Sequence, residues 1–166
     1  LIEKLKLVLA AAERYTYQLT GDMAHVALPG RQRTTRDLAY HVFMIPTAFL
    51  DAAEGSELTY EYFERRPGDD MTIDAIAALG ASVRKRLDCW WAEVADGTWP
   101  ETLATYYGRK ASRDVLERTA WHAAQHTRQL MRLLENAGIV PDGPLSEEDL
   151  AGLPLPTEVY DDQVRL

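Results

Sequence analysis

Apolar residues recur every three or four positions in four long stretches of the chain, and this spacing is typical of amphipathic helices. The two-residue alternation of strands is almost absent, apart from a stretch around residues 102–107 that reads as extended. We therefore predict an all-α fold. The predicted helices cover residues 2–19, 34–53, 72–95 and 112–137.

The segments between these helices predict how they connect. Thr34 or Thr35 and Ser112 are suitable N-caps for the second and fourth helices, and Gly138 suits the end of the fourth. Residues 56–70 are too many for a tight turn, so we predict a long crossover between the second and third helices of a four-helix bundle.

The last 28 residues differ from the rest of the chain. Residues 139–166 contain four of the eight prolines, which excludes a long helix, although residues 146–151 suit a single helical turn. We predict that residues 1–138 form the bundle domain. The irregular Pro-rich tail, residues 139–166, is expected to pack on the bundle or on a partner.

Length, charge and cysteine content narrow the classes of function. A chain of 166 residues fits one domain, and a net charge of −8 argues against nucleic-acid binding. No apolar run approaches the roughly 18 residues that cross a bilayer, and no export signal stands at the start. The lone Cys89 is compatible with a reducing cytoplasm, and it reads as a buried small apolar residue more than as a reactive thiol. We predict a cytoplasmic protein, and the start at Leu1 leaves open a further preceding domain.

His122 and His126 stand four residues apart in the fourth predicted helix, within "WHAAQH". At 100° per residue they project in nearly the same direction, at the edge of the apolar stripe that includes Val115 and Leu130. Two histidines at this spacing can bind one metal ion together, but a third ligand must come from elsewhere.

His41 is the candidate for that third ligand. It lies on the apolar face of the second predicted helix, three residues after Leu38 and four before Ile45. A buried imidazole without a partner costs roughly 1–3 kcal/mol, and one shared ion satisfies three at once. Hydrogen-bonded packing residues remain the alternative, and His25, in a predicted loop, is treated as a bystander.

Two motifs, "DLAYHVFMIPTAFL" and "VLERTAWHAAQHTRQLMRLLENAGI", resemble those of the DinB-like superfamily of four-helix metalloproteins. The resemblance covers residues 1–138 and rests on one histidine in the second helix and a His-x3-His in the fourth. An arginine and a Gln-Leu pair often follow in that family. The matching positions are His41, His122, His126, Arg128, Gln129 and Leu130.

The resemblance implies a divalent ion held by His41, His122 and His126, with a water or substrate completing its shell; zinc is favoured, with nickel or iron as alternatives. Similar proteins include S-transferases and isomerases that use bacillithiol, mycothiol or glutathione. The mycothiol-dependent isomerase branch has Glu where this chain has His122, so the resemblance favours a thiol S-transferase acting on a small molecule. A metal lowers the pKa of a bound thiol or water, which creates a nucleophile near neutral pH.

Other roles follow less directly from the residues. Gln125 and Gln129 lie beside the histidines and are candidates to orient an imidazole or a bound water.

Two other functions remain alternatives: a metal-dependent hydrolase using bound hydroxide, and a non-catalytic binding or stress protein. Each is compatible with a homodimer. The crossover offers candidates for substrate contacts, with a solvated loop as the alternative reading: Tyr60, Tyr62, Phe63, Arg65 and Arg66.

Overall fold

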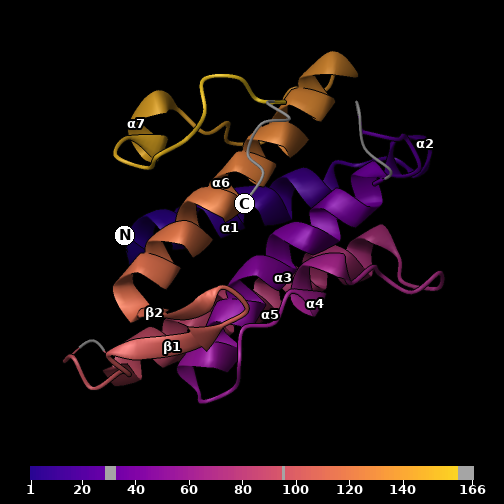
Figure 1. Ribbon diagram of the computed structural model, residues 1–166. Coiled ribbons are helices and arrows are strands. Elements are labelled where there is room, and N and C mark those ends of the chain that lie inside the picture. Colours follow the sequence, from indigo (N-terminus) through magenta and orange to yellow (C-terminus); the bar gives the residue numbers. More distant parts are fainter. Residues whose placement is uncertain (29–32, 95, 161–166) are drawn as a thin grey trace.

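The computed structural model describes residues 1–28, 33–94 and 96–160, and it confirms a predominantly helical fold (Figure 1). Each of the four predicted stretches is one long helix, with ends within two residues of the prediction. Three further helices are single turns. The long helices are α1 (Ile2–Tyr17), α3 (Thr35–Ala53), α5 (Ile73–Val94) and α6 (Ser112–Asn136), and the short ones are α2 (Gly21–Ala24), α4 (Glu61–Glu64) and α7 (Glu147–Leu150).

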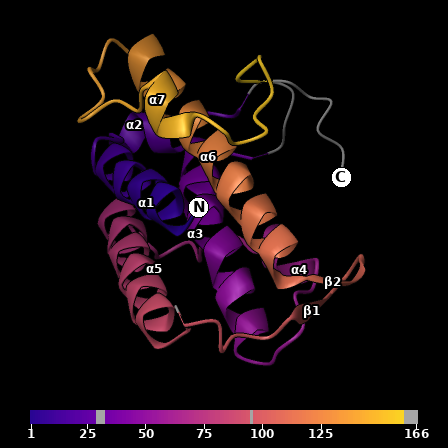
Figure 2. The same ribbon diagram turned by 90° about the vertical axis from the view of Figure 1, so that its left-hand side faces the viewer.

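The four long helices lie side by side, with α1 and α3 each in contact with both α5 and α6 (Figures 1 and 2). Their apolar faces meet in one core that includes Leu9, Phe43, Phe49, Leu87 and Leu130. Helix α3 is almost entirely buried because it packs against both α5 and α6. The residues of α3 therefore face the core on more than one side.

Local interactions fix the start of α3 and the end of α6. Thr34 and Asp37 form a capping box at the start of α3, in which each side chain accepts a hydrogen bond from the other residue's backbone N–H. After α6, Gly138 adopts φ 74°, a left-handed conformation that ends a helix at little cost for glycine. The predicted cap at Ser112 is wrong. Ala111 precedes the first turn of α6, and the Ser112 hydroxyl donates to the Pro100 carbonyl.

The stretch predicted as extended is a β-hairpin of β1 (Thr102–Thr105) and β2 (Gly108–Ala111). The crossover between α3 and α5 pairs with this hairpin, because the Leu58 N–H donates to the Ala104 carbonyl at 3.0 Å and the Tyr106 N–H to the Leu58 carbonyl at 2.8 Å. Sequence periodicity missed this pairing, since it joins two irregular segments far apart in the chain. The pairing brings α4 and the hairpin to the same end of α6.

Cys89 contradicts its predicted burial. It is exposed on α5, whereas the neighbouring Trp90 is buried against Phe49 and Trp99. The apolar stripe of α5 follows Val83, Leu87 and Trp90, and Cys89 falls one position off that stripe.

The segment after α6 returns along α1. The Arg14 guanidinium donates to the Asp142 and Gly143 carbonyls, and the Tyr15 hydroxyl bonds to the Gly143 carbonyl and the Leu145 N–H. A second capping box, of Ser146 and Asp149, begins α7. Within the described residues, no helix is both long enough and apolar enough to cross a membrane.

Gly80 sets the distance between α5 and α3. A methyl group on Gly80 would overlap the ring of Phe43, which is fully buried. We predict that Gly80→Ala lowers the free energy of unfolding by about 1–3 kcal/mol in urea titrations, because overpacking outweighs the helix propensity of alanine. Gly21→Ala is the matched control, since a methyl group there meets no atom within 4 Å. An unchanged stability of Gly80→Ala would show that the Phe43 ring moves freely.

Candidate metal centre

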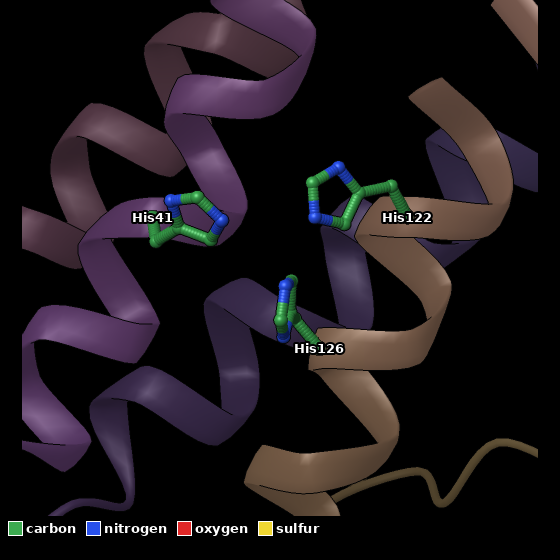
Figure 3. Close-up of side chains that lie close together, drawn as sticks. All are labelled: His41, His122 and His126. Atoms are coloured by element: carbon green, nitrogen blue, oxygen red, sulfur yellow. The ribbon is translucent and has the colours of Figure 1, made fainter. Parts of the chain in front are cut away.

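Three histidines from two facing helices converge at the contact between α3 and α6 (Figure 3). His41 comes from the second turn of α3, and His122 and His126 come from successive turns of α6. One ring nitrogen from each lies within 4.8 Å of the others, and the ring centroids are 4.9–5.5 Å apart. The structure thus brings together the three residues that the sequence analysis named.

The cluster is buried on one side and more open on the other. His41 and His126 are 3% and 5% exposed, whereas His122 is only partly buried. In Figure 3 the His122 ring lies at the end of the cluster nearest the start of α6, and His41 turns one nitrogen toward the other two rings. The side of His122 is therefore the more accessible side of the cluster.

Burial disfavours the charged form of His41. It lowers the pKa of this imidazole well below the ordinary range, and electrostatic interactions with His126 and Arg33 lower it further. A neutral ring keeps a nitrogen lone pair, which is the form that binds metals. Within the described residues, the buried Nδ1 of His41 has no hydrogen-bond partner.

His126 is held by a neighbour on its own helix. Its Nδ1 lies 2.8 Å from Oε1 of Gln129, one turn further along α6. Gln125, the other glutamine predicted to support the histidines, instead donates to the Val159 carbonyl and accepts from Arg128. Both glutamines are buried because residues 156–160 cover this side of α6.

An aromatic wall surrounds the open side of the cluster. Phe63 of α4 stands with its ring centroid 5.9 Å from that of His41 and 5.7 Å from that of His122. Tyr106 of the hairpin packs on Phe63 at 6.0 Å, and Trp121 lies 5.6 Å from His122. Sequence reasoning named Phe63 but missed Tyr106, because only the pairing of the crossover with β1 brings the two together.

Of the other crossover candidates, Tyr60 packs beside this wall, with its ring centroid 5.4 Å from that of Tyr106 and 6.4 Å from that of Phe63, whereas Tyr62, Arg65 and Arg66 have other partners. The Tyr62 hydroxyl donates to Asp51 at 2.6 Å, and Arg65 stacks over the Tyr62 ring at 4.2 Å. Arg66 is 3.8 Å from the Asp37 carboxylate, where its charge still contributes to the lowered pKa of His41. Tyr62 and Arg65 thus fasten α4 to α3, and Arg66 acts on the cluster through its field.

No family model matches this chain, and no curated protein sequence shows significant similarity to it.

The lowered pKa of His41 predicts how acid affects the metal-free protein. The unfolded chain binds a proton at His41 near pH 6.5, whereas the folded chain binds it only at lower pH. Acid therefore favours the unfolded chain: the contribution of His41 to the free energy of unfolding is fully present above pH 6.5 and is lost as the pH falls. We expect the free energy of unfolding to fall between pH 6.5 and 5 by up to about 1.4 kcal/mol per pH unit from this group.

His41→Leu should reduce that slope in urea titrations across the same pH range. His25→Leu is the matched control, because His25 is exposed in the turn after α2 and lies outside the cluster. Equal slopes for His41→Leu and the natural protein would contradict a buried neutral His41.

Proposed function

We propose that His41, His122 and His126 hold a divalent metal ion in a four-helix bundle of the DinB-like type. The observation that carries the proposal is the convergence of three imidazoles within 4.8 Å from two separate helices. Tetrahedral zinc with bonds of 2.0–2.1 Å places its nitrogen ligands about 3.4 Å apart. A small inward adjustment of the three rings reaches that spacing. All three side chains are attached to the backbone of a long helix, α3 or α6.

The donor set supports a transition metal with a free position. Three neutral nitrogen ligands suit zinc, nickel or iron, and they do not suit calcium or magnesium, which prefer oxygen. Three protein ligands leave a position for an exogenous ligand, as in catalytic zinc sites rather than closed structural ones. The partly exposed His122 provides the side from which that ligand would enter.

The surroundings favour an anionic ligand with an apolar part. The charges of Arg33 and Arg66 both act on His41, which supports a negatively charged group at the cluster. Phe63, Tyr106 and Trp121 would contact the organic portion of such a ligand. A bound metal ion supplies Lewis acidity, which lowers the pKa of a coordinated thiol so that it is a nucleophile near neutral pH.

These features support a metal-dependent S-transferase that uses a low-molecular-weight thiol. Cys89 is exposed on α5 and is not among the clustered histidines, so the nucleophilic sulfur would come from the thiol cofactor. In this reaction the thiolate sulfur forms a bond to an electrophilic carbon of the second substrate. The leaving group departs with the bonding pair, and the thiol proton passes to solvent.

The metal site is tested by metal content. Protein purified without an affinity metal and then loaded with zinc should bind one ion per chain, and His122→Ala should lose most of that binding because two histidines alone hold zinc weakly. Elemental analysis after dialysis measures the ratio. His25→Ala is the matched control and should keep one ion per chain, and an unchanged ratio in His122→Ala would contradict the proposed ligands.

The thiol dependence is tested with a model electrophile such as a chloronitrobenzene. The zinc-loaded protein should accelerate its conjugation to mycothiol, bacillithiol or glutathione, and His122→Ala should abolish the acceleration. Hydrolysis of activated esters that persists without any thiol would instead support a hydrolase. Absence of both activities in a protein with one bound zinc would contradict a catalytic role.

A further inference from the structure

Residues 156–160, called here the tail segment, are hydrogen-bonded to side chains of α6 on both sides of His126 in the sequence, at Gln125, Arg128 and Gln129. Side chains of α6 donate hydrogen bonds to its backbone carbonyls, and the Tyr160 hydroxyl of the tail segment donates to the Gln129 carbonyl at 3.4 Å. Arg128 donates to the Pro156 carbonyl at 2.9 Å and to the Thr157 carbonyl at 3.3 Å. The Val159 carbonyl accepts from Gln125 at 2.8 Å and from Gln129 at 2.9 Å.

Gln129 joins the tail segment to a proposed metal ligand. Its Nε2 donates to the Val159 carbonyl at 2.9 Å, and its Oε1 lies 2.8 Å from Nδ1 of His126. A carbonyl oxygen only accepts hydrogen bonds, so the amide nitrogen of Gln129 must face Val159. The amide oxygen then faces His126, and Nδ1 of that ring must carry the hydrogen. The lone pair is left on Nε2.

This choice of tautomer decides whether His126 can serve as a ligand. Figure 3 shows one nitrogen of the His126 ring on the side of His41 and His122 and the other on the opposite side, along α6. Since Nδ1 bonds to Gln129, the nitrogen toward the cluster is Nε2. A reversed amide would set two oxygens against each other at Val159 and would direct an N–H of the His126 ring into the cluster.

We infer that the tail segment is a positioning element for the metal centre, and that its docking on α6 and metal binding at His126 reinforce each other through Gln129. The inference rests on the proposed metal site. Because coupling between two binding events is reciprocal, release of the tail segment weakens metal binding by the same factor by which metal binding favours docking.

The tail segment can leave α6 without unfolding it. An open pocket of about 390 Å³ lies at the edge of this contact, lined by Met131 of α6 and by Pro156 and Val159 of the tail segment. The residues of α6 beneath it are polar, Gln125, Arg128 and Gln129, and they would be solvated in its absence. The tail segment can therefore dock on α6 and leave it while the helical core stays folded.

Four proteins test the coupling: the natural protein, a form truncated after Leu155, Gln129→Glu and Gln18→Ala. Glutamate at 129 still accepts from His126 Nδ1 but repels the Val159 carbonyl, so it separates the two functions of Gln129. Gln18→Ala is the matched control, because Gln18 donates to the Val140 carbonyl at 2.8 Å and is likewise a glutamine that holds the C-terminal segment. Circular dichroism verifies the helix content of each form.

The first readout is the tautomer of His126 in the metal-free protein, measured from its ring ¹⁵N chemical shifts. We expect Nδ1–H in the natural protein, in Gln129→Glu and in Gln18→Ala, and a mixture of tautomers after truncation. This readout needs no metal. It therefore tests the role of the tail segment even if the proposed metal site fails.

The second readout is zinc affinity by competition with a chromophoric chelator. Truncation should weaken zinc binding about 3- to 10-fold, below the 10- to 100-fold typical when a ligand's hydrogen-bond partner is lost, while Gln18→Ala stays within about 2-fold. Zinc should also slow cleavage after Glu158 by a Glu-specific protease in the natural protein but not in Gln129→Glu.

Two results would overturn the inference. One is a truncated form with the natural His126 tautomer and natural zinc affinity. The other is cleavage after Glu158 that zinc does not affect in a natural protein that binds it. A natural protein that binds no zinc but shows the Nδ1–H tautomer, lost on truncation, would contradict the metal site and leave the positioning by the tail segment supported.

Discussion

The packing of α3 against α6 is the constraint on which the candidate centre depends. His41 meets His122 and His126 only if the two helices present these residues at the same height along their axes. The capping box at Thr34 sets where α3 begins, and the close approach of Gly80 to Phe43 holds the other side of α3 against α5. The same apolar contacts that stabilise the fold therefore position the three imidazoles.

Electrostatics at this contact distinguish the cluster from ordinary core packing. A buried, neutral His41 beside two more imidazoles lowers the stability of the metal-free chain, and the nearby charges of Arg33 and Arg66 raise the cost of protonating it. Histidines with strongly shifted pKa values are more typical of functional sites than of residues that only pack in a core. The aromatic wall adds to this effect, because Phe63 and Tyr106 offer no counter-charge.

The parts of the structure that obey helical periodicity could be predicted from the sequence. His41, His122 and His126 each lie on an apolar helical face, so their convergence followed from turning two helices toward a shared core. Periodicity is silent about irregular segments. It therefore missed the pairing of Leu58 with the hairpin and the cover that the tail segment gives Gln125 and Gln129. The burial predicted for Cys89 was a different error, because it followed the residue type, whereas the helical spacing of Leu87 and Trp90 places Cys89 off the buried stripe of α5.

The pairing of the crossover with the hairpin has a consequence for how this molecule can diversify. The metal-ligating candidates stand on α3 and α6, whereas Phe63 and Tyr106 belong to two irregular segments joined to each other through Leu58. Substitutions or insertions in these segments change the wall without shifting the helices. A lineage of such proteins could exchange one small-molecule partner for another through loop changes alone, while the three imidazoles stay where the core holds them.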